Sequence, residues 1–140
     1  MEKISRNQEN YLIMTIIYDE IADFTTAGNG LNFRGVDEIV QQLTDEPFNK
    51  QSDYVQNMVA SVLTHYGEII EAFQPHLRDW VWNRLPLLTQ SVLLMSYAHF
   101  YYVEKIDKRI VINVAVDLAK KYIEEKQAKF INAILDEVLK

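Results

Sequence analysis

The sequence predicts an all-helical protein with about seven helices in a single compact domain, residues 1–140. Apolar residues recur at intervals of three and four along the chain, and no alternation with a period of two persists. Only four glycines and three prolines occur, and apolar residues make up 49% of the chain, which excludes collagen-like and intrinsically disordered classes. A chain of this length buries about two-thirds of the surface that its unfolded form exposes, so we expect a self-sufficient core.

The first helix is predicted to begin after Ser5 and to end near Ala27. Serine is a preferred residue type just before a helix, and apolar residues then recur on one face. Residues 28–32, Gly-Asn-Gly-Leu-Asn, have the composition of a turn, because glycine and asparagine tolerate positive φ. Gly35 is expected to close this connection before a short second helix.

Proline and glycine mark the expected boundaries in the middle of the chain. Pro47 blocks the continuation of the second helix, and a third helix is expected from about Ser52. Gly67 is expected to interrupt that helix before a second apolar stretch. Pro75 begins the next connection, which leads into a short aromatic-rich helix or turn at residues 80–85.

A long apolar helix is predicted at residues 85–103, where the chain has no charged residue. Pro86 suits its first position, because the missing N–H costs nothing there. The polar side chains between Thr89 and His99 would need partners in lipid. We therefore expect a helix enclosed by other helices of the protein rather than a membrane span.

A charged turn at residues 104–108 is followed by two amphipathic helices. Each is expected to present one apolar stripe to the core, and spacing alone places Phe130 and Leu135 there. The inner stripe of the first of these helices comprises Val111, Val114, Ala115, Leu118, Ala119 and Tyr122.

The charge of the chain is distributed unevenly. The net charge of −6 argues against nucleic-acid binding, because affinity for phosphate depends on Lys and Arg. Residues 105–129, however, contain seven Lys or Arg against four Asp or Glu, a local balance of +3. This local excess permits one basic surface on an otherwise acidic domain. A helix face exposed to solvent also explains the same charges. The absence of cysteine fits an intracellular, reducing setting.

No common enzyme motif occurs in the sequence. The chain lacks the patterns G-x-x-x-x-G-K, G-x-G-x-x-G, G-x-S-x-G and H-E-x-x-H. His65, His76 and His99 lie in three different segments, without the spacing that would direct two imidazoles at one metal ion. We therefore predict neither a catalytic site nor a metal or other cofactor.

Two blocks near the end of the chain carry a specific pattern. They read I-N-V-A-V-D-L-A-K-K-Y at residues 112–122 and K-F-I-N-A-I-L-D at residues 129–136. These blocks resemble the I-N-E-A-I-E-L-A-K and K-F-V-N-G-V-L-D signatures of the NusB family of bacterial transcription antitermination factors, and the spacing between them also fits. The Trp-x-Arg-Leu run at residues 82–85 and the opening with Ser5, Arg6 and Tyr18 resemble the family more weakly.

The resemblance implies an all-helical fold of two three-helix sub-bundles without catalytic activity. It further implies a cytoplasmic protein that acts in rRNA transcription by binding single-stranded RNA of the boxA type together with NusE, a small-subunit ribosomal protein. Asn113 and Asn132 lie among apolar positions, so we expect both to be buried with their amides bonded to backbone at helix junctions. The sequence leaves open whether the chain forms a homodimer.

The chain departs from the family pattern at positions that bear on RNA binding. Asn7 and Asn10 stand where the second and third arginines of the opening are expected, and Glu9 adds a negative charge. In the long apolar helix, Leu94 and His99 stand where the family tends to have an arginine and a glutamate, which we interpret as one coupled structural change. The alternative function is therefore a NusB-like protein–protein interaction module that has lost RNA affinity. A third hypothesis for its function is that of the NusB-like accessory domain of some rRNA methyltransferases.

The remaining basic residues supply the candidate RNA contacts. Readers of single-stranded bases usually present exposed rings near basic side chains. Tyr101 lies close to such residues in the sequence, whereas Tyr102 is expected to face the core. The resemblance packs the first helix near the later ones, so we expect the two basic segments to converge. The candidate RNA-binding residues are Lys3, Arg6, Tyr101, Lys105, Lys108 and Arg109.

Overall fold

The computed structural model describes residues 4–27 and 33–140. These residues form seven α-helices and no strand, which confirms the predicted all-helical class. The α-helices are α1 (Arg6–Ala27), α2 (Phe33–Thr44), α3 (Asp53–Thr64), α4 (Tyr66–Phe73), α5 (Leu87–Ala98), α6 (Lys108–Tyr122) and α7 (Glu125–Val138). The short segments between them are the 3₁₀ helices η1 (Phe48–Lys50), η2 (Gln74–His76) and η3 (Trp82–Arg84), and the π-helix η4 (His99–Val103).

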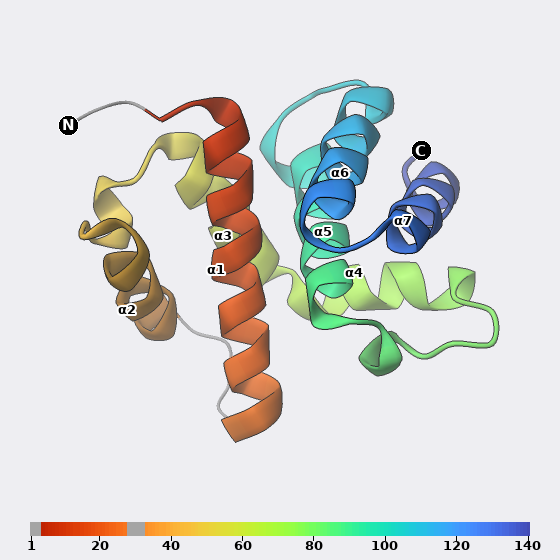
Figure 1. Ribbon diagram of the computed structural model, residues 1–140, viewed down its shortest axis with the longest axis horizontal. Coiled ribbons are helices and arrows are strands. Elements are labelled where there is room, and N and C mark those ends of the chain that lie inside the picture. Colours follow the sequence, from red (N-terminus) through yellow and green to blue (C-terminus); the bar gives the residue numbers. More distant parts are fainter. Residues whose placement is uncertain (1–3, 28–32) are drawn as a thin grey trace.

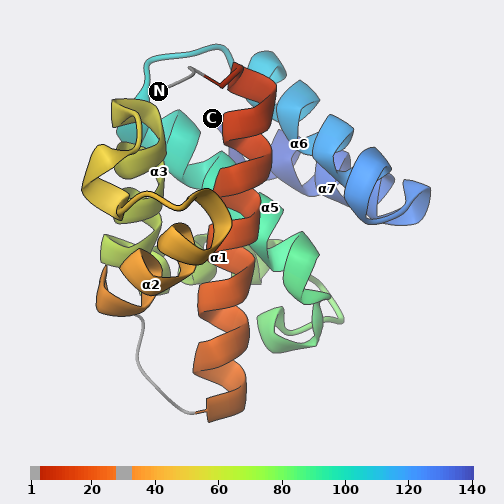
Figure 2. The ribbon, with the colours of Figure 1, turned by 60° about the vertical axis from the view of Figure 1, so that its left-hand side comes forward.

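Helix α5 lies at the centre of the arrangement, where it contacts α1, α3, α4, α6 and α7. In Figure 1, α1, α2 and α3 lie on one side, and α6 and α7 lie on the other. Figure 2 shows α6 and α7 packed side by side at the edge of the molecule. The expected division into two three-helix sub-bundles stays a prediction, because α5 contacts helices of both sides.

Helix α1 begins where predicted, because Ser5 and Gln8 cap it reciprocally. The Ser5 hydroxyl accepts a hydrogen bond from the backbone N–H of Gln8 at 3.2 Å. The Ser5 N–H in turn donates to the side-chain oxygen of Gln8 at 2.8 Å, which completes a capping box. The helix ends at Ala27, as expected. The turn predicted at residues 28–32 lies outside the described residues.

Two expected helix boundaries are wrong, because both glycines concerned lie inside helices. Helix α2 already contains Gly35 in its first turn, where a Cβ would lie 2.8 Å from Oε2 of Glu20 in α1. The break expected at Gly67 lies instead at His65, which ends α3 and precedes α4. The His65 ring stacks on Tyr102, with centroids 4.0 Å apart. Both Gly35 and His65 thus lie against segments that are distant in the sequence.

Helix α5 is buried nearly all round, as its uniformly apolar sequence predicts. Nine of its twelve residues are buried. Its polar side chains find partners inside the protein: the Ser91 hydroxyl donates to the backbone carbonyl of Met14 in α1 at 2.7 Å. Pro86 directly precedes the first residue of the helix. In the part of the chain that the structure describes, no helix has both the length and the apolar character needed to cross a membrane.

Burial in α6 and α7 differs from the expectations at Phe130, Asn113 and Asn132, and also at Tyr122, which is described below. Leu135 is fully buried, as predicted, whereas Phe130 is only half-buried and shares a surface cleft with Trp80. Asn113 and Asn132 are both exposed, so the expectation that they are buried is wrong. Each directly follows a buried isoleucine, and one residue rotates a helix by about 100°, which turns the amide outward.

Candidate nucleic-acid interface

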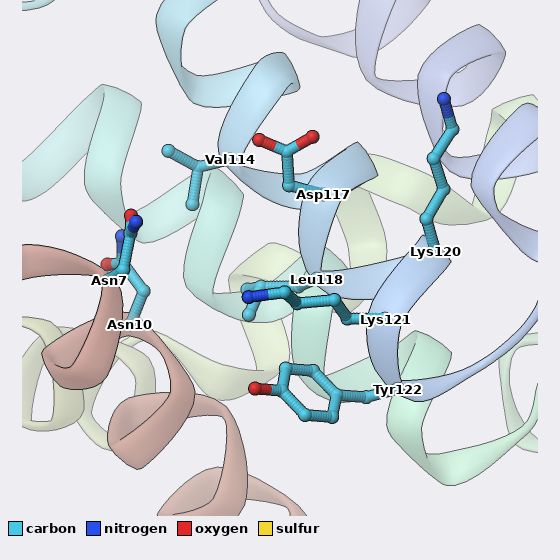
Figure 3. Close-up of a pocket in the computed structure, with 8 residues that line it drawn as sticks. All are labelled: Asn7, Asn10, Val114, Asp117, Leu118, Lys120, Lys121 and Tyr122. Carbon is cyan, nitrogen blue, oxygen red and sulfur yellow. The ribbon is translucent and has the colours of Figure 1, made fainter.

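A groove runs between the first turns of α1 and the last turns of α6. It comprises two neighbouring cavities of about 240 Å³ and about 360 Å³. Asn7, Lys121 and Tyr122 line both cavities, and Leu43 and Thr44 at the end of α2 line the second. Figure 3 shows the first cavity. We call this feature the α1–α6 groove.

Two exposed tyrosines form the aromatic part of the groove. Tyr11 of α1 and Tyr122 of α6 are 43% and 41% exposed, and their ring centroids lie 4.6 Å apart. The expectation that Tyr122 belongs to the inner stripe of its helix is therefore wrong: its ring packs against Tyr11 at the surface. Exposed rings of this kind stack on nucleobases with little dependence on base identity.

Two lysines bring positive charge to the last turn of α6. Lys120 and Lys121 are exposed, and neither forms an ion pair with the described residues. In Figure 3, Lys121 and Tyr122 both project toward α1, whereas Lys120 projects away from it. The C-terminal end of a helix also stabilises nearby cations through the helix dipole. A phosphate in the groove would therefore meet an ammonium group directly beside an aromatic ring.

Asn7 and Asn10, the two positions that depart from the arginine-rich opening, differ in their surroundings. Both line the first cavity, and Asn7 is exposed. Asn10 is buried, and its Oδ1 accepts a hydrogen bond from the Tyr54 hydroxyl at 2.5 Å. Of the two amides, only that of Asn7 is available to a ligand. The charged residues that line the groove, Asp117, Lys120 and Lys121, all belong to α6.

Arg6 lies on the other flank of α1 and faces the turn at residues 104–108. Its guanidinium lies 3.6 Å above the centre of the Tyr54 ring, 3.4 Å from Glu104 and 3.5 Å from Glu9. The start of α1 and this turn lie at the same end of the molecule (Figures 1 and 2), so Arg6 lies beside the second basic segment. Two carboxylates offset the charge of Arg6 there.

Glu104 is shared between Arg6 and His99. Its Oε2 lies 3.0 Å from Nε2 of His99, whose side chain is only 5% exposed, and its Oε1 lies 3.4 Å from Nη1 of Arg6. The hydrogen bond from His99 and the nearby charges of His99 and Arg6 lower the pKa of the Glu104 carboxyl below its usual range. Glu104 therefore stays ionised at neutral pH.

The other basic candidates differ in their exposure and in the ion pairs that they form. Lys105 is exposed and makes no ion pair with the described residues. Arg109 is 84% exposed and lies 3.1 Å from Asp107, the residue that caps α6. Lys108 instead reaches across to the end of α7, where it pairs with Asp136. Lys3 lies outside the described residues.

Tyr101 and Tyr102 are both at the surface, so the expectation that Tyr102 faces the core is wrong. They are 42% and 38% exposed. The π-helical turn η4 accommodates one more residue than an α-helical turn, which re-aims the side chains that follow. The Tyr101 hydroxyl donates to the Val138 carbonyl at 3.3 Å and accepts from the Lys140 N–H at 3.1 Å. Its ring also packs against those of Tyr97 and Phe100, with centroids 4.5 Å and 4.9 Å away.

The three histidines occupy separate environments. His65 stacks on Tyr102, His76 lies 3.7 Å from Glu137, and His99 faces Glu104. Across residues 4–27 and 33–140, no group of three or more His, Cys, Asp or Glu is arranged to hold a metal ion. The histidines of this chain thus have separate local partners.

The sequence patterns missed Lys120, Lys121 and the pair of Tyr11 with Tyr122 as candidate binding residues. The signal for the lysines was present, because two adjacent cations end the last turn of a predicted helix. No local signal reveals the tyrosine pair, since its members come from the first and sixth helices.

The fold and the groove define a small all-helical protein with an aromatic surface groove that two lysines line. The chain belongs to the NusB family, whose family model matches residues 12–140. It is 30% identical over 105 residues to the transcription antitermination protein NusB of Listeria welshimeri, which covers 75% of this chain and 80% of the relative. It is 29% identical over 136 residues to the protein of the same name from Sulfurimonas denitrificans, which covers 97% of each chain.

Solved structures share the fold. NusB of T. maritima superposes with a TM-score of 0.79 at 20% identity, covering 99% of this chain and 92% of that one. This chain also resembles a chain in a crystal structure of the antitermination factors NusB and NusE in complex with dsRNA. The TM-score is 0.71 at 21% identity, and the match covers 97% of this chain and 98% of that one. These likenesses establish the architecture.

Proposed function

We propose that this chain is a transcription antitermination factor that acts in rRNA transcription by binding single-stranded RNA of the boxA type together with the ribosomal protein NusE. Membership of the NusB family supports this function, as do relatives named transcription antitermination protein NusB. A similar structure contains NusB with NusE and dsRNA. We further propose that residues 1–140 act as one domain, in the cytoplasm and without catalytic activity.

The α1–α6 groove is the observation that carries RNA binding. A single strand presents unstacked bases and a phosphate at every nucleotide, so it needs rings and cations at close spacing. The groove offers both, because Lys121 and Tyr122 are adjacent in α6 and project together toward α1. A base stacked on Tyr122 or Tyr11 would leave its phosphate within reach of Lys121.

The basic residues at the start of α1 and at the turn at residues 104–108, on the other flank of α1, form a second part of the proposed RNA surface. Lys105 and Arg109 are exposed cations that fit phosphate contacts. The polar atoms of Tyr101 and Lys108 hold the end of α7, so the ring of Tyr101 rather than its hydroxyl would meet a base. The proposed contacts on this side are Lys3, Arg6, Tyr101, Lys105 and Arg109, whereas the ammonium group of Lys108, the sixth candidate, is engaged by the end of α7.

A filter-binding titration over a range of salt concentrations tests this function. The probe is a single-stranded RNA with a boxA-type sequence, and the control is a scrambled strand of the same length, each measured with and without purified NusE. We expect NusE to tighten binding, and log affinity to fall linearly with log salt, by about 0.7 for each phosphate contact. No measurable binding in the presence of NusE would contradict RNA binding, and NusE binding alone would favour the interaction module.

A further inference from the structure

The first cavity of the α1–α6 groove contains a carboxylate that phosphate binding does not explain. Asp117 of α6 is exposed, lines this cavity and forms no hydrogen bond or ion pair with the described residues. A carboxylate beside a bound RNA strand repels its phosphates. It also accepts hydrogen bonds without donating any, so its partners on the strand are the 2′-hydroxyls and the N–H groups of the bases.

Asn7 lines the same cavity from the other helix. It lies in the first turn of α1, it is exposed, and its amide has no partner among the described residues. In Figure 3, Asn7 lies across the cavity from Asp117, and the apolar side chains of Val114 and Leu118 lie between α1 and that carboxylate. The cavity of about 240 Å³ therefore offers a ligand one carboxylate, one amide and an apolar surface.

The donors and acceptors of the four bases decide which base fits these two polar groups. Guanine presents two adjacent donors, N1–H and N2–H₂, which match the two oxygens of one carboxylate, and beside them the acceptor O6, which suits an amide N–H₂. The same edge of adenine, cytosine or uracil has a single N–H or N–H₂ group next to an acceptor atom. A carboxylate opposite one of these three bases would face that acceptor, which is unfavourable. Asp117 and Asn7 together therefore favour guanine.

We propose, resting on the RNA-binding function above, that the first cavity of the α1–α6 groove recognises a guanine of the bound strand. Asp117 accepts hydrogen bonds from N1–H and N2–H₂ of the base, and the Asn7 amide donates to O6. Tyr122, which also lines this cavity, stacks on the base, and Lys121 beside it meets the phosphate. Asn7 then replaces a phosphate contact of the arginine-rich opening with a contact to a base.

A base scan of the bound strand tests this specificity. The probe is a labelled single-stranded RNA of the boxA type that carries guanosine, inosine or adenosine at each position in turn, and fluorescence anisotropy with NusE present measures its affinity. Inosine keeps N1–H and O6 but lacks N2–H₂, so it removes one of the two donors to Asp117. At one position we expect the wild type to bind guanosine about tenfold more tightly than adenosine, and inosine with an intermediate affinity.

Two substitutions separate base recognition from electrostatic repulsion. Asp117→Asn is expected to bring the ratio of guanosine to inosine affinity toward one and to tighten binding of the adenosine strand, because it removes a negative charge. Asn7→Ala is expected to lower the preference for guanosine over adenosine without a change in the salt slope, because it removes no charge. The matched controls, Asp79→Asn and Asn113→Ala, change exposed residues outside the groove and should keep the wild-type ratios.

The outcomes distinguish the guanine site from the proposed function. RNA binding without a preference for guanosine at any position would overturn the guanine site alone, and so would an equal preference in the wild type and Asp117→Asn. Free guanosine monophosphate is a separate arm. Competition that Asp117→Asn abolishes, without a base preference in the strand, would assign the cavity to a free nucleotide and overturn the proposal. No binding of any strand with NusE present would overturn the proposed function together with the guanine site.

Discussion

Lys108, at the start of α6, and Asp136, in the last turn of α7, form an ion pair with 3.0 Å between Nζ and Oδ1. The same ammonium group donates to the backbone carbonyls of Asp136 at 3.1 Å and Leu139 at 3.4 Å. The last carbonyls of a helix lack intrahelical partners, so Lys108 caps α7 and joins it to α6. Its donors are engaged before any ligand binds.

These contacts predict different effects for two neighbouring basic residues. Arg109→Ala removes an exposed cation and is expected to lower the slope of log RNA affinity against log salt by about 0.7, without a change in stability. Lys108→Ala is expected to leave this slope nearly unchanged and to lower the free energy of unfolding by about 1 kcal/mol, a figure reduced for its partial exposure. Filter binding and urea unfolding measure the two quantities.

Asp136→Asn serves as the matched control for Lys108, because it removes the ion pair without changing a candidate RNA contact. We expect it to lower stability less than Lys108→Ala and to leave the salt slope at the wild-type value. A slope reduced by Lys108→Ala at unchanged stability would show instead that Lys108 contacts phosphate.

The α1–α6 groove predicts that aromatic and basic residues contribute to RNA binding in different ways. Tyr122→Ala is expected to weaken binding by about 1–3 kcal/mol through lost base stacking, with little effect on the salt slope. Lys121→Ala is expected to lower the slope by about 0.7, because it removes a phosphate contact. Fluorescence anisotropy with a labelled strand over a range of salt concentrations separates the two effects.

Two further variants control for this interpretation. Tyr122→Phe keeps the ring and should bind RNA like the wild type. Lys129→Ala removes an exposed lysine of α7 that does not line the groove, so the slope should not change. Wild-type affinity in Tyr122→Ala would exclude the groove as the RNA site.

The helices could be predicted from the sequence because each depends on residues a few positions apart. Ser5 with Gln8 caps α1, and Pro86 directly precedes α5, so both signals act locally. The two helix starts lie at or beside the expected positions. The roles of Gly35 and His65 depend on Glu20 and Tyr102, which lie elsewhere in the sequence. Such contacts form only after the helices pack, so no local rule reveals them.

The candidate site was less predictable for the same reason. The excess of Lys and Arg at residues 105–129 indicates a basic surface, but not which side chains remain available. Lys108 and Arg109 are adjacent, yet one binds the end of α7 and the other pairs with Asp107 while its side chain stays 84% exposed. Tyr11 and Tyr122 each look like stripe residues of separate helices, and only tertiary packing places them together at the surface.

The partial burial of Phe130 predicts a moderate effect on stability. Its ring lies beside Trp80 and Pro86 in a cleft of about 160 Å³ that opens to solvent. We expect Phe130→Ala to lower the free energy of unfolding by about 1–2 kcal/mol, and Leu135→Ala, at a fully buried position, to lower it by about 2–5 kcal/mol. Urea unfolding tests both, and an equal loss for the two variants would show that Phe130 is buried like Leu135.

The raised pKa of Tyr54 predicts a loss of stability at alkaline pH. Burial raises the pKa of Tyr54 to about 12 from its ordinary value of 10.0. The folded protein therefore holds this proton more tightly than the unfolded chain. As the pH rises from about 10 to about 12, the unfolded chain ionises first, and the folded state loses about 2–3 kcal/mol of stability relative to pH 8. Below pH 10 neither state ionises, so no effect is expected there.

Tyr54→Phe separates this ionisation from the structural role of the hydroxyl. The variant loses the hydrogen bond to Asn10, so we expect lower stability than the wild type at pH 8, by about 1 kcal/mol or more. It has no phenol to ionise at this position, so its further loss between pH 10 and 12 should be smaller than in the wild type. Tyr122→Phe, at an exposed tyrosine, should keep the wild-type pH dependence. Equal alkaline losses in Tyr54→Phe and the wild type, measured by urea unfolding at pH 8, 10 and 11.5, would assign the effect to other groups.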